Sequence, residues 1–138
     1  MQEQWIKWEP VEGLGSKYYV ESIYSNVESG FKMILSEVEN NKNKVYVFFK
    51  YCVADHRTIN GNFRNKIIDA LREEYGSEFY NSWSFFKVNN SAYVKWVSEE
   101  SYGTSDIRNF THYSFIAENS IVDIITNHKV EVKIIDLP

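Results

Sequence analysis

The sequence predicts an α+β fold, with a mostly antiparallel β-sheet and two helices in one domain. Three observations lead to this prediction. Several short runs are rich in β-branched and aromatic residues and are bounded by Asn, Gly and Ser. Two other segments, about 62–75 and 91–101, repeat apolar residues at helical spacing. The length of 138 residues fits one hydrophobic core, so we expect a single domain over residues 1–138.

The first half of the chain predicts an arm, a strand and a hairpin. Residues 1–16 are interrupted by Pro and Gly, and we expect an irregular arm with at least one Trp docked on the domain. Residues 17–24 favour a strand, although their apolar residues also fit a helical stripe. The runs 31–39 and 44–53 flank four Asn-rich residues, which predicts a hairpin. The almost wholly apolar run 44–53 predicts a central strand buried on both faces.

The most regular helical pattern follows. Residues 54–61 are mostly polar and predict a turn, after which Asn62 is a plausible N-cap. Apolar residues recur every four positions, and Gly76 supplies a C-terminal stop. The expected apolar stripe consists of Phe63, Ile67, Leu71 and Tyr75.

The second half predicts a strand, a helix and a second hairpin. Residues 82–88 have strand composition, and the Asn-Asn-Ser that follows is suited to begin the helix at 91–101. The runs 111–117 and 120–126 are separated by two residues, which indicates a tight hairpin. Residues 129–135 alternate apolar and charged side chains, as in a half-exposed strand at a sheet edge.

The charge of the chain limits its partners. The formal net charge is −4 and the isoelectric point is about 5.4, which argues against nucleic acid and anionic membrane surfaces. The N-terminus lacks the pattern of a secretion signal, and no apolar run reaches the ~20 residues that span a bilayer. The only cysteine, Cys52, lies in an apolar run and suggests an inert thiol in a reducing cytoplasm.

Two of the three histidines suggest one enzymatic alternative. His56 and His112 each stand two residues before a Thr or Ser. This weakly resembles the two-histidine phosphoesterases, in which each His acts as acid or base and each hydroxyl binds phosphate. Arg57 departs from that pattern, because the family has an apolar residue there. The histidines have no metal-ligand spacing, so we expect neither a metal nor another cofactor.

Asp123 is an unusual residue because it interrupts an apolar run. If both faces of the run are buried, the carboxylate requires a hydrogen-bonding or charged partner, and if only one face is buried, Asp123 is expected to share its face with Ile121 and Ile125. Arg108 and His112 are candidates for that partner. A functional role for Asp123 is the alternative to this structural one.

A surface suited to binding a partner is predicted between residues 96 and 106. Four residues of this stretch, Glu99, Glu100, Tyr102 and Asp106, form an acidic loop without a basic residue, and Trp96 adjoins it. Acidic and aromatic side chains together suit recognition of a basic protein partner. The alternative is that these charges form an ordinary solvated face.

The order of motifs over roughly residues 83–135 resembles small bacterial immunity proteins of polymorphic and contact-dependent toxin systems. The motifs are Trp-Ser-Phe-Phe-Lys-Val at 83–88, Asn-Ser-Ala-Tyr-Val-Lys-Trp at 90–96, Glu-Glu-Ser-Tyr-Gly at 99–103, His-Tyr-Ser-Phe-Ile at 112–116 and Ile-Val-Asp-Ile-Ile at 121–125. The resemblance implies a non-enzymatic protein that covers the active site of a cognate toxin. A small ligand-binding or structural module is a further alternative.

Overall fold

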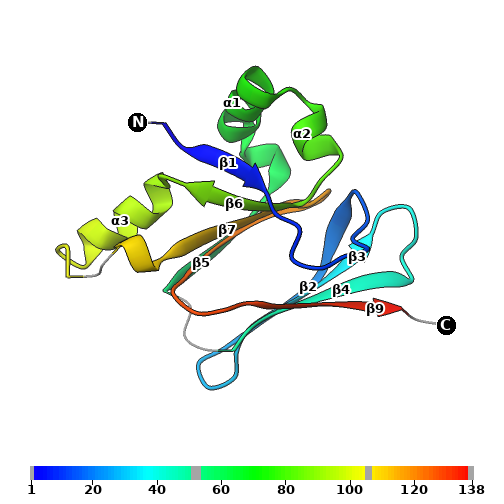
Figure 1. Ribbon diagram of the computed structural model, residues 1–138, viewed down its shortest axis with the longest axis horizontal. Helices are drawn as coiled ribbons and strands as arrows, with labels where there is room; N and C mark the ends of the chain where they lie inside the picture. The colour runs from blue at the N-terminus through cyan, green and yellow to red at the C-terminus, as the bar shows by residue number, and fades with distance from the viewer. Residues whose placement is uncertain (1, 51–53, 105–106, 137–138) are drawn as a thin grey trace.

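Two antiparallel β-sheets and a layer of helices are stacked in the computed structural model (Figure 1). The structure describes residues 2–50, 54–104 and 107–136. The larger sheet, sheet A, lies between the smaller sheet, sheet B, and the helices α1 and α2. The predicted α+β fold with mostly antiparallel strands is confirmed, and the strands are divided between two sheets.

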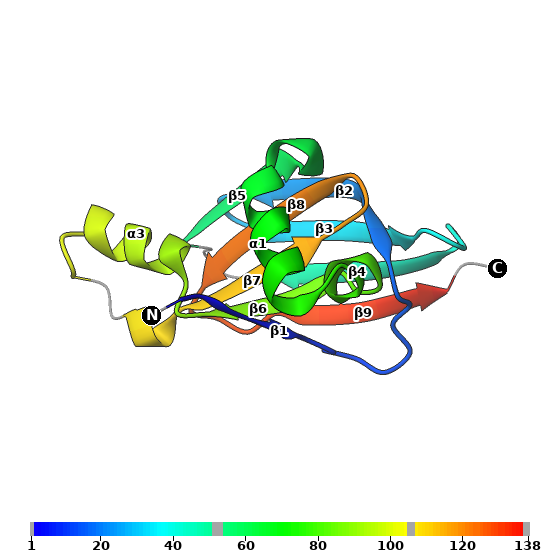
Figure 2. The same ribbon diagram turned by 90° about the horizontal axis from the view of Figure 1, so that it is seen from above.

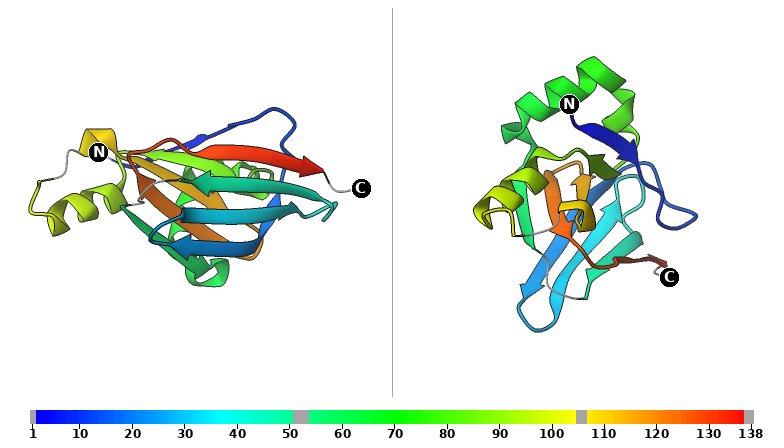
Figure 3. Two further views of the ribbon diagram at one scale, coloured as in Figure 1. Left: turned by 90° about the horizontal axis from the view of Figure 1, so that it is seen from below. Right: turned by 60° about the vertical axis from the view of Figure 1, so that its left-hand side comes forward.

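Sheet A has five strands and sheet B has four, and every neighbouring pair is antiparallel. The order in sheet A is β1 (Gln4–Lys7), β6 (Phe85–Asn89), β7 (Thr111–Ile116), β8 (Ser120–Thr126) and β5 (Asp55–Asn60). The order in sheet B is β2 (Tyr18–Asn26), β3 (Gly30–Glu37), β4 (Asn43–Phe49) and β9 (Glu131–Asp136). Figure 3 shows sheet B from its uncovered side.

The helices occupy two places around sheet A. The first group, α1 (Asn65–Tyr75) and α2 (Glu78–Asn81), lies over the face of sheet A that is turned away from sheet B. The other helix, α3 (Ala92–Glu100), extends away from one end of the sheets (Figure 2). Short 3-10 turns at Gly61–Phe63 and Ile107–Asn109 complete the helical structure of the described residues.

The hydrophobic core has a main part between the sheets and a second part beneath the helices. The main part is rich in aromatic rings, which meet edge to face at centroid distances such as 5.5 Å between Phe85 and Phe115. The second part packs Trp5, Phe86 and Ile121 of sheet A against Leu71 of α1 and Tyr80 of α2. Burial of these large side chains supplies most of the driving force for the fold.

The β7–β8 hairpin is at the centre of this arrangement. Every residue of β8 is buried, and so is every residue of β7 except Thr111, because sheet B covers one face of the hairpin and the helices cover the other. Residues 44–53 were expected to form a central strand buried on both faces, and this expectation is wrong for the outer face. Its described part, β4, lies inside sheet B and alternates between buried and half-buried side chains, because nothing covers the outer face of sheet B among the described residues.

Most predicted elements are confirmed. Both hairpins form, as do the strand near 17–24, the strand near 82–88, and helices close to 62–75 and 91–101. The strand near 129–135 is at the edge of sheet B, as expected. Gly76 ends α1 with φ of +83°, a conformation that suits glycine.

Four further predictions about local structure are wrong. Phe63, which was expected on the apolar stripe of the first helix, lies in the 3-10 turn before α1 and is 75% exposed. Residues 55–60 are not a turn but the edge strand β5, which gains its hydrogen bonds from β8, far away in sequence. Part of the expected irregular arm is the strand β1, although Trp5 is docked as expected. Asn62 is not the cap residue: the side chain of Asn60 accepts the N–H of Asn62, and α1 begins after Arg64 without a side-chain cap.

Candidate functional site

Asp123 is the centre of a buried polar cluster on the face of sheet A that is turned toward the helices. Its Oδ2 accepts hydrogen bonds from Arg57 Nε at 3.1 Å and from Arg64 Nη1 at 3.0 Å. Its Oδ1 lies 2.7 Å from His112 Nε2. Arg57 is on β5, His112 is on β7, and Arg64 immediately precedes α1. The carboxylate therefore connects three separate elements to β8.

The Asp123 carboxylate is kept ionised by these partners. Burial alone would raise its pKa, but the hydrogen bond and charge of His112 and the charge of Arg57 outweigh burial and hold the pKa well below its usual range. A buried carboxylate without such partners would destabilise the fold by several kcal/mol. The expected hydrogen-bonding partner is confirmed as His112, and Asp123 shares its face with Ile121 and Ile125.

His112 continues the polar cluster toward α3. Its Nδ1 lies 2.7 Å from Ser91 Oγ, so Ser91, His112 and Asp123 form a hydrogen-bonded chain. The order resembles a hydrolase triad, but Ser91 Oγ also accepts the N–H of Val94 and thereby caps α3. Ser91 is 5% exposed, and both of its described hydrogen bonds are to groups of the protein itself. The chain of side chains fixes the start of α3 on sheet A.

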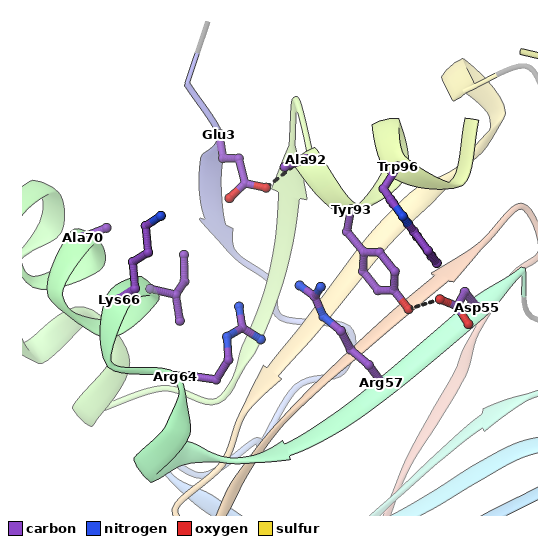
Figure 4. Close-up of a pocket in the computed structure, with 10 residues that line it drawn as sticks. Glu3, Asp55, Arg57, Arg64, Lys66, Ala70, Ala92, Tyr93 and Trp96 are labelled. Carbon is purple, nitrogen blue, oxygen red and sulfur yellow. Dashed lines mark hydrogen bonds between the residues drawn. The ribbon is translucent and has the colours of Figure 1, made fainter. Parts of the chain in front are cut away.

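A cavity of about 610 Å³ opens beside this cluster, between α1, α3 and β5 (Figure 4). Ligand sites in proteins commonly have volumes of about 300–1,000 Å³. The lining combines three cationic side chains, two acidic ones, two aromatic rings and small apolar residues. These residues are Arg57, Arg64, Lys66, Glu3, Asp55, Tyr93, Trp96, Ile67, Ala70 and Ala92.

The acidic side chains of the cavity are engaged by other groups of the protein. Asp55 Oδ2 accepts the hydroxyl of Tyr93 at 2.6 Å, and Glu3 Oε2 accepts the N–H of Ala92 at 2.8 Å (Figure 4). Burial, together with the hydrogen bond to Asp55, raises the pKa of Tyr93, so its hydroxyl stays protonated and donates. Both carboxylates thus help to fix α3.

The cationic side chains have donors left over. The guanidinium carbon of Arg57 lies 4.1 Å from the centroid of the Tyr93 ring, and its Nε donates to Asp123. Among the described residues, no acceptor contacts the Nη atoms of Arg57, and Lys66 forms neither an ion pair nor a hydrogen bond. The cavity therefore presents unpaired N–H donors on the side formed by β5 and α1.

The predicted partner-binding residues lie at the far end of α3. Trp96 is 49% exposed and borders the cavity, with its ring centroid 6.1 Å from that of Tyr93. Glu99 and Glu100 are exposed in the last turn of the helix, and Tyr102 follows with 96% of its surface exposed. Four of the five predicted residues therefore lie on one projecting segment. Asp106 lies outside the described residues.

Tyr102 has an unusual backbone conformation. Its φ is +53°, in the left-handed region that glycine adopts without cost, and Gly103 follows with φ of +72°. The N–H of Gly103 reaches Ser98 O at 2.8 Å and ends the helix. A large exposed ring therefore occupies a position where the backbone alone would favour glycine.

The two histidines proposed for a phosphoesterase site do not meet. His56 is opposite Ile124 in β8, and its ring centroid lies 4.8 Å from that of Phe31 in sheet B. The His56 side chain is therefore on the face of sheet A turned toward sheet B. His112 contacts Asp123 on the opposite face of sheet A. Because side chains alternate between the two faces of a strand, the two imidazoles cannot flank one phosphate, and the geometry does not support the alternative of a shared phosphoesterase site.

Other sequence-based expectations about sites concern metals and cysteine. No group of three or more potential metal ligands is present among the described residues. Cys52 lies outside the described residues. Along the parts of the chain that the structure describes, no helix has the length and apolar character needed to cross a membrane.

Comparison with known proteins gave no match: no family model, curated protein or solved structure is significantly similar to the chain. The function proposed below therefore depends on the geometry of the chain itself.

The cavity and its cations were not predicted from the sequence. Arg57 and Arg64 lie 66 and 59 residues before Asp123 in the chain. The only signal was Asp123 itself, a carboxylate inside an apolar run, which indicated that cationic or polar partners must come from elsewhere. Arg57 reaches Asp123 only because β5 pairs with β8. The sequence of β5 predicts a turn, so this pairing could not be expected.

Proposed function

We propose that the chain is a non-enzymatic, immunity-type protein, which binds a cognate bacterial toxin and neutralises it by covering the toxin's active site. The observation that carries the proposal is the set of exposed rings and acids at the projecting end of α3. It consists of Trp96, Glu99, Glu100 and Tyr102, and we name it the α3 tip. The resemblance of residues 83–135 to immunity proteins supports the same function.

The chemistry of the α3 tip suits a basic protein surface. Exposed Trp and Tyr are the residues that most often dominate the affinity of protein interfaces. Glu99 and Glu100 supply charges that steer and orient a partner rich in Lys or Arg. A toxin that cleaves or binds an anionic substrate carries such basic groups around its active site, and an acidic tip can occupy that place.

The conformation of Tyr102 supports a role in binding. A tyrosine at a left-handed helix end costs stability, and such strain is concentrated at functional sites. The hydrogen bonds at the end of α3 would form equally well with glycine at this position. Contact of the ring with a partner gives a reason for its presence there.

An immunity protein acts where its toxin acts, and we expect the chain to work in the cytoplasm. Its net charge of −4 suits a basic protein partner better than nucleic acid or an anionic membrane.

The test is protection of cells from the toxin encoded by the neighbouring gene. The toxin is co-expressed with the chain or with its Glu99→Lys, Glu100→Lys double variant, and the affinity of the purified pair is measured by calorimetry. We expect the chain to restore growth, and the variant to bind at least about 100-fold more weakly, because two charges at the contact are reversed.

The matched control is Glu73→Lys, Glu74→Lys. These glutamates are also consecutive and exposed in the last turn of a helix, α1, so the control makes the same change in net charge elsewhere. We expect it to protect as the unmodified chain does. Equal affinity of both double variants for the toxin would exclude the α3 tip from the interface, and failure of the unmodified chain to bind the toxin would contradict the proposed function.

A further inference from the structure

We propose that the cavity between α1, α3 and β5 binds a small organic anion, in which a carboxylate or a phosphate is attached to a flat apolar group. This second site does not depend on the proposed toxin partner. It follows from the arrangement of cations, hydrogen-bond donors and rings around the cavity in Figure 4.

The position of two of the cations is fixed by Asp123. Arg57 Nε and Arg64 Nη1 both donate to Asp123 Oδ2, so the buried carboxylate holds both guanidinium groups at the cavity wall. The remaining N–H groups of a guanidinium are planar and parallel, a geometry that matches the two oxygens of a carboxylate or phosphate. Two fixed guanidinium groups therefore offer an anion donors that need little reorganisation before binding.

Lys66 adds a third positive charge from α1. Its ammonium has no ion pair among the described residues, although it lies in the first turn of a helix, where a cation is unfavourable. Lys66 is exposed, and an anion in the cavity would give it a counter-charge. The two acidic side chains of the lining form no ion pair with Lys66 among the described residues, although both keep their negative charge: Asp55 accepts the neutral hydroxyl of Tyr93, and Glu3 accepts the N–H of Ala92.

The apolar part of the lining selects the rest of the ligand. The ring of Tyr93 is already covered on one side by the guanidinium of Arg57. The ring of Trp96 is half exposed at the border of the cavity and is available for stacking against a flat group. Ala70 and Ala92 are small, and together with Ile67 they leave an apolar space of ligand size.

The experiment uses three probes that share one ring system. They are 1-naphthaleneacetate, 1-naphthyl phosphate and the neutral 1-naphthaleneacetamide, titrated into the full chain at low ionic strength and followed by calorimetry. We expect both anions to bind with saturation and the amide to bind at least about tenfold more weakly, because it cannot pair with the cations. The tighter of the two anions identifies the headgroup that the site prefers.

Matched lysine variants locate the binding. Lys66→Gln removes one cation of the cavity, and Lys95→Gln removes an exposed cation of α3 that lies outside the lining. We expect Lys66→Gln to weaken the anions about tenfold or more and Lys95→Gln to leave them within about twofold. Lys66 forms no hydrogen bond or ion pair among the described residues, and its charge is unfavourable at the start of α1, so the Lys66→Gln variant should unfold at the temperature of the unmodified chain or slightly above it.

Three results would overturn the proposal: no saturable binding of either anion, equal binding of the amide, or equal weakening by the two lysine variants. Trp96 belongs to both the cavity lining and the α3 tip, so the two sites are tested separately at residues that they do not share. The Glu99→Lys, Glu100→Lys variant should still bind the naphthyl anions, and Lys66→Gln should still protect cells from the toxin.

Discussion

His112 Nε2 lies 2.7 Å from Asp123 Oδ1, and both side chains are almost completely buried. The pair faces the helical layer rather than the space between the sheets. It holds β7 and β8 in a polar cluster that also receives Arg57 and Arg64. The energetic consequences of this cluster can be measured separately from any function of the chain.

Asp123→Asn should destabilise the chain strongly. The substitution removes the only negative charge that contacts Arg57 and Arg64 among the described residues, so both guanidinium groups lose their compensation. Breaking a fully buried pair costs about 3–5 kcal/mol, and we expect a smaller loss of about 2–3 kcal/mol here because Arg57 and Arg64 are partly exposed and solvent compensates part of their charge. Urea unfolding measures the change in the free energy of unfolding. Asp69→Asn is the control, because Asp69 pairs with Arg72 on the surface and should contribute less than about 1 kcal/mol.

The same carboxylate should make stability fall in acid. In the unfolded chain, Asp123 titrates near its usual pKa of about 4, whereas in the folded chain the pKa is well below this range. The unfolded state therefore binds more protons in this window, and the contribution present above about pH 4 is lost as pH falls through the folded pKa. NMR titration of the Asp123 carboxyl between pH 6 and pH 3 should show no protonation midpoint. A protonation midpoint near pH 4 would show that the pKa of Asp123 is not lowered in the folded chain.

Tyr102→Gly should stabilise the chain and weaken toxin binding at the same time. Glycine adopts the left-handed conformation of residue 102 without the steric cost of a side chain, and we expect the free energy of unfolding to rise by about 1 kcal/mol. Loss of the ring should lower the affinity for the toxin. Tyr102→Ala also removes the ring but keeps the strained position, so it should weaken binding without the gain in thermal stability.

Lys17→Met should show how strongly one buried ammonium stabilises the join between α2 and sheet A. Lys17 Nζ donates to the carbonyl oxygens of Tyr80, Trp83 and Ile116, the last at 2.6 Å. Burial lowers the pKa of Lys17 to about 8, so the group is charged at pH 7. Loss of these donors outweighs the relief of the burial cost that lowers the pKa, and we expect a net loss of about 1–2 kcal/mol in urea unfolding at pH 7.

The control for this prediction is Lys42→Met. Lys42 is exposed in the turn between β3 and β4, and its substitution should change the free energy of unfolding by less than about 0.5 kcal/mol. Equal effects of the two substitutions would show that the carbonyl contacts of Lys17 contribute nothing.

Elements whose pattern is local could be predicted from the sequence. The helix ending at Gly76 and the β7–β8 hairpin follow from apolar spacing and turn chemistry within a few residues. The strand β5 could not be predicted, because Asp-His-Arg-Thr-Ile-Asn has turn composition and becomes a strand only by pairing with β8. Tertiary pairing thus overrides local preference there.

Of the two candidate sites, one could be predicted from the sequence and the other could not. The α3 tip could be predicted as an exposed segment because its acids and rings are neighbours in sequence. The cavity could not, because its cations become neighbours only when β5 and the start of α1 are placed beside Asp123. The opposite orientations of His56 and His112 likewise depend on strand register, which the sequence pattern did not specify.

The pairing of β4 with β9 has a consequence for synthesis on the ribosome. In register, Asn43 is opposite Asp136 and Phe48 is opposite Glu131, so β4 has no second neighbour until the last described strand has been translated. Until then, a nascent chain presents the open hydrogen-bonding edge of β4, which is a template for aggregation. Completion of the smaller sheet must therefore follow translation of residue 136, and transient association with a chaperone would protect this edge in the interval.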